Sequence, residues 1–341
     1  MRPLHKPRTE MQAQAQTIPE GAINPYVFIV GCPRSGTTML KRMLDAHASI
    51  AITRETHWIT HLFKKRTGMT QDGIVLGDVV DRLCEHRRFS HLGLDRSAVE
   101  ALVADGSEMT YPDLVSKIFD LYAAKDGKPL AGDKTPPYVR RIPLLHKLFP
   151  QAKFIHLVRD GRDAGLSLMN WRNAERAMGE QPTWVEDPVS TTALWWEWHI
   201  RLGREAGAEL GDSLYYEMQY EKLVADPEGE CRAMCEFLDL SYDTNMVHYE
   251  KRKPADVDAQ GSTGSANARW LPPTRGLRDW RTQMTPEQLE RFEAASGALF
   301  DELGYERGCE TISASATEHA ARMRSQFKGK RLPTSWGVTN D

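Results

Sequence analysis

A strand, a loop and a helix can be identified in YVFIVGCPRSGTTMLKRMLDA, residues 26–46. Tyr26 to Val30 is a continuous apolar run of aromatic and β-branched residues, which is typical of a strand buried on both faces of a parallel sheet. The loop from Gly31 to Gly36 follows, and residues 37–46 then carry apolar side chains at helical spacing. Strand, glycine-containing loop and helix form the first half of a β-α-β unit. We therefore predict that an α/β fold begins here.

The same order of elements recurs further along the chain. Residues 153–158 (KFIHLV) predict a second buried strand, followed by a turn and a helix over about 163–171. Residues 213–218 (SLYYEM) predict a third strand, followed by a loop and a helix that ends near Leu238. Repeated units of this kind indicate a P-loop-like three-layer α/β/α fold around a central parallel sheet.

The sequence divides into three parts. Residues 1–24 are polar, without the apolar core of a signal peptide, and predict a flexible N-terminal leader. Residues 25–308 hold the repeated units and predict one domain, in which amphipathic segments over 65–130 form a helical insertion or cap above the acceptor side of the sheet. Residues 309–341 predict a polar C-terminal extension.

Composition excludes several classes of protein. The chain has 341 residues, 40% hydrophobic and 27% charged, with a net charge of −3, and a pI near 6.4. A chain without a basic excess is not expected to bind nucleic acid as its main partner. No apolar run approaches the roughly 20 residues that span a bilayer. The five cysteines have no metal-site spacing, so we expect reduced thiols, no metal and a cytoplasmic location.

The loop after the first strand has the residue types of an anion site. Carboxyl ends of parallel strands open toward ligands, and the helix that follows presents backbone amides there. A charged guanidinium and several hydroxyls gather in the same loop, yet the GxxxxGK pattern followed by Ser or Thr is absent, so a triphosphate is not the expected ligand. A simple glycine-rich turn is the alternative. The predicted anion-binding residues of this loop are Pro33, Arg34, Ser35, Gly36, Thr37 and Thr38.

A second motif, VRDGRDAGLSL at residues 158–168, follows the second predicted strand. Arg159 lies just past the strand, and Ser167 lies eight residues on, along the next helix. An arginine and a serine placed in this way suit a second, separate phosphate. Alone the motif is weak, because Arg/Asp pairs in turns are often local ion pairs. Two anion motifs in one domain predict a ligand with two anionic groups.

Together the two motifs resemble the donor site of sulfotransferases, the enzymes that use 3′-phosphoadenosine 5′-phosphosulfate (PAPS). Within that family the first motif is most similar to the bacterial and tyrosylprotein branch, where the loop carries an arginine such as Arg34. The resemblance implies that residues 33–38 hold the 5′-phosphosulfate and that Arg159 and Ser167 hold the 3′-phosphate. It also implies PAPS as the co-substrate, with no metal required.

Two further stretches extend the resemblance. Tyr220 opens a YEKL segment that is similar to one near the adenine in the family, although a core aromatic is the alternative. RGLRDWR, residues 275–281, resembles the late loop that closes over the 3′-phosphate, but Asp279 stands where the family often has glycine. Which arginine contacts the phosphate is therefore left open among Arg275, Arg278 and Arg281.

The resemblance also supplies the catalytic candidates. Glu55 occupies the place of the family's general base, and Lys134 in GDKTPPYV matches a lysine that, with Arg34, stabilises the leaving phosphate. In-line placement and charge stabilisation are what such a group transfer needs. A solvated loop acid at Glu55 and a surface lysine at Lys134, paired with the adjacent Asp133, are the alternatives. His57 is a reserve candidate for the base.

We therefore expect a PAPS-dependent sulfotransferase that transfers a sulfuryl group to an acceptor hydroxyl or amine. The expected acceptor is a small molecule or glycan: a carbohydrate, a glycolipid or a secondary metabolite. The alternatives are a protein tyrosine or, with less support, a P-loop kinase activity on another substrate. The sequence leaves the oligomeric state open, with a dimer among the options.

Overall fold

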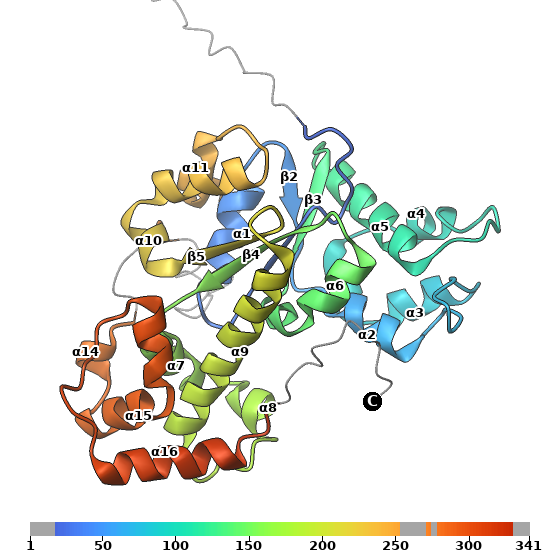
Figure 1. Cartoon of the computed structure of the whole chain (residues 1–341). Helices are drawn as coiled ribbons and strands as arrows, with labels where there is room; N and C mark the ends of the chain where they lie inside the picture. The colour runs from blue at the N-terminus through green and yellow to red at the C-terminus, as the bar shows by residue number, and fades with distance from the viewer. Residues whose placement is uncertain (1–17, 253–270, 274–277, 330–341) are drawn as a thin grey trace, which may run out of the picture.

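The computed structural model describes residues 18–252, 271–273 and 278–329. Its centre is a five-stranded sheet in the order β2-β3-β1-β4-β5, with every neighbouring pair parallel (Figure 1). The predicted α/β fold with a central parallel sheet is therefore confirmed. The strands are β1 (Val27–Gly31), β2 (Ile50–Ile52), β3 (Leu130–Lys134), β4 (Lys153–Val158) and β5 (Tyr215–Gln219).

Helices cover both faces of this sheet, which gives three layers (Figure 1). Alternate residues of β1 enter two different cores: Val27 and Ile29 pack with α1, α10 and α11, whereas Phe28 and Val30 pack with α2, α5 and α6. A strand that is buried on both faces needs apolar residues at every position, which explains the uninterrupted run in the sequence. These helices are α1 (Thr37–Asp45), α2 (Trp58–Lys65), α5 (Tyr111–Lys125), α6 (Ile142–Leu148), α10 (Tyr220–Ala225) and α11 (Pro227–Phe237).

A third core lies beyond the sheet, where the long helix α9 packs against α7, α15 and α16. Trp196 of α9 stacks on Phe300 of α15 with ring centroids 5.1 Å apart. Ala320 and Met323 of α16 are also buried there. Residues 314–326, within the range predicted as a polar extension, therefore form a helix that packs on the domain. The elements are α7 (Gly161–Met169), α8 (Ala174–Met178), α9 (Pro188–Leu210), α14 (Trp280–Gln283), α15 (Pro286–Leu303) and α16 (Ala314–Gln326).

The range 65–130 contains only helices and connecting loops between β2 and β3. Buried Leu83, Phe89 and Val99 join the core that also contains Phe28 of β1. The insertion is thus continuous with the main domain. Its elements are α3 (Val79–Glu85), η1 (Phe89–Leu92), α4 (Arg96–Ala101) and α5, and the remaining short helices of the chain are η2 (Pro136–Arg141) and η3 (Thr244–Arg252).

The predicted strands at 26–30, 153–158 and 213–218 all exist, with bounds shifted by two residues at most. Two expectations were wrong. Strands β2 and β3 were not predicted, and residues 220–225 form helix α10, where a loop was expected. Of the helices in the described part of the chain, none is long and apolar enough to cross a membrane.

Candidate active site

Each of the five strands ends at a predicted site residue. Glu55 lies three residues after β2, Lys134 closes β3, the loop 31–36 follows β1, Arg159 follows β4 and Tyr220 follows β5. Because all five strands are parallel, these groups line one edge of the sheet. The fold therefore gathers residues that are spread over 186 positions of the chain, from 34 to 220.

Two glycines shape the loop after β1 because no other residue fits. Gly31 has φ +152°, and a Cβ there would lie 2.6 Å from the backbone oxygen of Leu157. Gly36 has φ +96°, and a Cβ there would lie 2.6 Å from the ring of Tyr220. The left-handed backbone and the close neighbours both demand glycine. Gly36 then caps α1, so the loop runs directly into a helix N-terminus.

The loop presents donors without partners. The hydroxyl of Ser35 is fully buried and has no hydrogen-bond partner among the described residues. The first turn of α1, from Thr37, presents amides that no carbonyl within the helix can accept from. Pro33 and Thr38 are half-buried on either side. A buried orphan hydroxyl next to a helix N-terminus fits an anion, which would supply the missing acceptor oxygens.

The two predicted anion motifs touch each other. Arg34, whose φ is +76°, lies in the first motif, and its Nε donates to Oγ of Ser167 in the second at 3.0 Å. The guanidinium of Arg159 lies 4.4 Å from the ring centre of Tyr220, and its NH2 donates to Asp163 at 3.4 Å. Nε of Arg159 is buried without a partner among the described residues. The structure therefore brings together residues of the two motifs and Tyr220.

The late loop is only partly described. Arg275 lies outside the described residues, and Arg278 is exposed. The side chain of Arg281 pairs with Glu306 and stacks on Trp280, and neither is a predicted site residue. The Trp280 amide donates to Asp163 Oδ1 at 3.0 Å, which ties this segment to α7.

Asp279, which departs from the family pattern, has a local structural role. Its carboxylate caps α14 by accepting from the amide of Arg281 at 3.1 Å. This cap is a sufficient reason for an aspartate at the position.

Glu55 lies at the centre of a charged cluster. Its Oε1 pairs with Nζ of Lys134 at 3.1 Å, and its Oε2 pairs with Nε2 of His57 at 3.2 Å and with Arg88 at 3.1 Å. Burial alone would raise the pKa of Glu55, but hydrogen bonds from His57 and Lys134 and the lysine charge outweigh it and hold the pKa well below its usual range. Glu55 is therefore ionised at neutral pH.

The contacts at this cluster count against the alternative given for Lys134. Lys134 is buried rather than on the surface, and it pairs with Glu55, not with Asp133. His57 is a hydrogen-bond partner of Glu55. Arg88 was not predicted: it lies in the helical insertion, 33 residues after Glu55, and no local pattern marks it.

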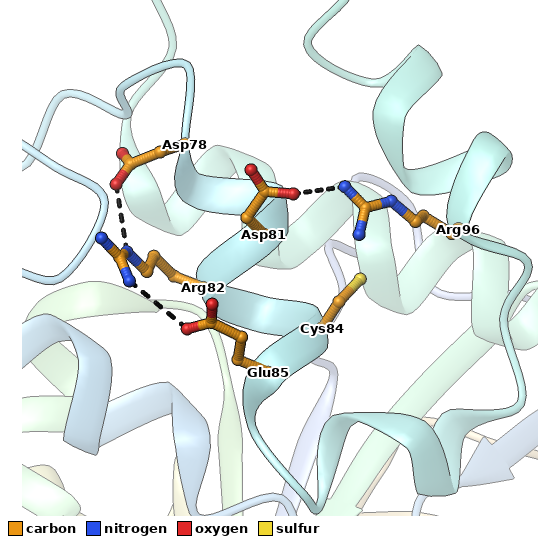
Figure 2. Close-up of a pocket in the computed structure, with 6 residues that line it drawn as sticks. All are labelled: Asp78, Asp81, Arg82, Cys84, Glu85 and Arg96. Atoms are coloured by element: carbon orange, nitrogen blue, oxygen red, sulfur yellow. Dashed lines mark hydrogen bonds and ion pairs between the residues drawn. The ribbon is translucent and has the colours of Figure 1, made fainter.

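A separate hollow of about 420 Å³ lies between α3 and α4. Its charged side chains pair with one another: Arg96 with Asp81, and Arg82 with Asp78 and Glu85 (Figure 2). None of the predicted site residues lines it. Within the described residues, no group of three or more His, Cys, Asp or Glu side chains could hold a metal ion.

The two predicted anion motifs thus lie together at one edge of a parallel α/β sheet. The profile described as "Sulfotransferase family" matches residues 25–244. The chain belongs to the sulfotransferase family. The match covers all five strands and the residues that follow each of them, including Tyr220 after β5.

The chain is also similar in sequence to individual sulfotransferases. The chain is 29% identical over 237 residues to "Protein-tyrosine sulfotransferase 2" of Gallus gallus, covering 68% of this chain and 56% of the relative. It is 25% identical over 243 residues to "Protein-tyrosine sulfotransferase A" of Caenorhabditis elegans, covering 69% and 55%. The chain thus spans just over half the length of these relatives.

Solved structures agree on the fold. The "Sulfotransferase Domain from the Synechococcus PCC 7002 Olefin Synthase" superposes with a TM-score of 0.54 at 22% identity, covering 82% of this chain and 94% of that one. The "Sulfotransferase Domain from the Curacin Biosynthetic Pathway" superposes with a TM-score of 0.51 at 19% identity, covering 88% and 97%. At these identities the likeness concerns the fold alone.

Proposed function

We propose that this protein is a PAPS-dependent sulfotransferase that transfers a sulfuryl group to an acceptor hydroxyl. The loop 31–36, with the orphan hydroxyl of Ser35, fits the 5′-phosphosulfate. Arg159, with its unpartnered Nε, and Ser167 fit the 3′-phosphate. The bound nucleotide would supply the activated sulfuryl group.

The contact between Arg34 and Ser167 carries this proposal. A hydrogen bond of 3.0 Å joins two motifs that lie 133 residues apart in the chain. A glycine-rich turn that served only to connect β1 with α1 would need no second polar motif beside it. Two adjacent sets of hydrogen-bond donors, each at the start of a helix, suit one ligand that carries an anionic group at each end.

The catalytic roles follow from charge and position. Glu55 is ionised, which is the form that can accept the proton of an attacking hydroxyl. Lys134 is a buried cation, and the strand register places it beside Ile29, two residues before the anion loop. It can therefore neutralise charge on the departing phosphate, together with Arg34.

The pairing of Glu55 with Lys134 also has a consequence for base strength. A carboxylate with a low pKa is a weak base, and general-base catalysis works best when the pKa lies near the working pH. When Lys134 turns toward a bound phosphosulfate, Glu55 loses a cationic partner and its pKa rises. We propose that donor binding prepares the base in this way.

For the acceptor we propose a tyrosine side chain of a peptide. Relatives at 25% to 29% identity are named as protein-tyrosine sulfotransferases. This supports the tyrosine over the carbohydrate or secondary metabolite that was first expected. The family match likewise favours sulfuryl transfer over a kinase activity. We keep the cytoplasm as the proposed compartment because all five cysteines are free thiols.

Calorimetric titration with 3′,5′-adenosine bisphosphate tests the donor site. We expect binding by the wild-type protein, and a loss of at least about tenfold in Arg159→Ala and Ser167→Ala, since each removes a charge-assisted or hydroxyl contact. Arg201→Ala is the matched control, because Arg201 is itself exposed and pairs only with Glu197 of α9 and Glu302 of α15, neither of which is a predicted site residue. Failure of the nucleotide to bind, with ATP and Mg²⁺ binding instead, would overturn the proposal.

The acceptor is tested by following formation of adenosine bisphosphate from PAPS. A tyrosine-containing peptide is compared with the same peptide carrying phenylalanine, and with a panel of sugars and phenols. We expect turnover with the tyrosine peptide only. Turnover with a sugar and not with the peptide would restore the first expectation and refute the tyrosine proposal.

A further inference from the structure

The segment that carries Glu55 is fixed on both sides of this residue. Thr53 lies two residues before it and Thr56 one residue after it, and both hydroxyls donate to Oδ1 of Asp133, at 3.5 Å and 3.0 Å. The two threonines and Asp133 are buried, with at most 1% of their surface exposed. Glu55 therefore lies within a short segment, residues 53–56, that is held to strand β3 on both sides of Glu55. We call this segment, with its contacts to Asp133, the bracket.

Further contacts close the bracket. Thr135 donates from its hydroxyl to the same Oδ1 of Asp133 at 2.9 Å, and accepts from the Thr56 amide at 2.9 Å. The Thr53 amide donates to the carbonyl of Gly132 at 2.8 Å. One carboxylate oxygen thus accepts from three hydroxyls, which leaves the segment little freedom to move.

The position of Asp133 on its strand explains how the bracket affects Glu55. Successive side chains of a strand point to opposite faces, so Asp133 and Lys134 leave β3 in different directions. Asp133 holds the segment 53–56 by its threonines, while Lys134 pairs with the Glu55 carboxylate. Strand β3 therefore fixes both the backbone and the carboxylate of Glu55.

We propose that Asp133 is a positioning residue of the transfer reaction: its Oδ1 holds Thr53 and Thr56 and thereby sets the Glu55 carboxylate against Lys134. The proposal rests on the proposed role of Glu55 as the base. In this proposal Asp133 acts only through Glu55 and does not contact either substrate.

The acceptor oxygen, rather than the negative charge, is the essential feature of Asp133. Its Oδ2 is buried without a partner among the described residues, so a proton there leaves Oδ1 free to accept from all three hydroxyls. Burial, only partly offset by the hydrogen bonds from Thr135 and Thr56, raises the pKa of Asp133 to about 7, which agrees with a proton held at that oxygen. Asparagine offers the same Oδ1, whereas alanine offers none.

The test compares Asp133→Ala with Asp133→Asn. In Asp133→Ala we expect kcat to fall by about 10- to 100-fold, the scale of a base displaced by about 1 Å. The affinity for adenosine bisphosphate, measured by calorimetry, should stay within about twofold, since the loop 31–36, Arg159 and Ser167, which are assigned to the nucleotide, follow β1 and β4. In Asp133→Asn we expect kcat within about threefold of wild type, because Oδ1 is restored.

A double-mutant cycle with Glu55→Gln separates positioning from a general loss of structure. If Asp133 acts through Glu55, adding Asp133→Ala to Glu55→Gln lowers the residual rate little further. Multiplied losses in the double variant, or no rescue by asparagine, would overturn the proposal. A Glu55→Gln variant with full activity would instead refute Glu55 as the base, so failure of the two proposals can be told apart.

Two further variants serve as controls. Asp187, also buried, caps α9 through Ser190 and pairs with His319, so Asp187→Ala should lower stability and leave kcat within about twofold. Thr56→Val removes one hydroxyl and keeps the carboxylate, so it tests the bracket if Asp133→Ala does not fold. We expect Thr56→Val to lower kcat at unchanged nucleotide affinity. Unchanged kcat in Thr56→Val would count against the bracket.

Discussion

Replacement of Asp133 by asparagine should remove a pH dependence from the stability of this protein. Burial raises the pKa of the folded-state carboxyl to about 7, whereas an unfolded aspartate titrates at about 3.9. The folded state therefore holds this proton more tightly than the unfolded state. As pH rises through this interval, the free energy of unfolding falls, and above pH about 7 it levels off.

The size of the effect follows from the two pKa values. A gap of roughly 3 units corresponds to about 4 kcal/mol at 1.36 kcal/mol per unit. Part of the loss occurs below pH 5, so about 2 to 3 kcal/mol remains between about pH 5 and pH 8. Asp133 has no exposed surface, so solvent screening does not reduce this figure. In Asp133→Asn the contribution is absent.

The assay is urea unfolding followed by tryptophan fluorescence, at several pH values between about 5 and 8 for both proteins. Groups other than Asp133 titrate in both and cancel in the difference. We expect the unfolding free energy of the wild type to fall relative to Asp133→Asn as pH rises. Asp301→Asn is the control: hydrogen bonds from Arg307 lower the pKa of Asp301 in the folded state, so its difference from wild type should be constant over this range. A constant difference for Asp133→Asn as well would refute the reasoning.

Two other variants test the packing around the site. Gly36→Ala should destabilise the protein by about 1 to 3 kcal/mol and weaken nucleotide binding, because the new methyl group would displace the Tyr220 ring; in Gly304→Ala, which has φ +73° and open space, urea unfolding should show only the smaller backbone cost. Arg162→Met should lower the thermal midpoint and cost about 3 to 5 kcal/mol, since it removes the buried guanidinium that pairs with both Glu293 and Asp160. Wild-type stability in either Gly36→Ala or Arg162→Met would contradict these contacts.

Strand β1 was predictable because a run of consecutive apolar residues indicates a strand that is buried on both faces. Strand β3, LAGDK, was not, although all five residues are buried. Gly132 is needed there because a Cβ would lie 2.5 Å from Val27. The two charged residues have most of their partners in residues 53–56, far away in sequence. Asp133 relies on three threonines and Lys134 on Glu55. Local sequence patterns reveal strands made of consecutive apolar residues. They do not reveal a buried strand whose polar side chains find their hydrogen-bond and ion-pair partners only in the folded structure.

The candidate site shows the same division. The groups of the anion loop and of the second motif were predictable because each follows a strand and opens a helix. The partners of Glu55 were not fully predictable, since one of them, Arg88, belongs to the helical insertion and lies 33 residues further along the chain. Arg281 fits the family pattern, but its side chain pairs with Glu306 and stacks on Trp280, and neither of these is a predicted site residue. Whether an arginine such as Arg281 faces a ligand or pairs with another side chain depends on tertiary packing, which local sequence patterns do not show.

The strand order separates the two halves of the proposed reaction in space. Most groups assigned to the nucleotide follow β1, β4 and β5. The pair formed by the proposed base Glu55 and the phosphate-neutralising Lys134 lies at the ends of β2 and β3, on the other side of the sheet. The helical insertion joins β2 to β3 and contributes Arg88 to that pair (Figure 1). Selection for a new acceptor can therefore act on the insertion while the nucleotide half stays constant. A chimera that exchanges residues 58–128 with those of a relative should change acceptor preference and retain nucleotide affinity.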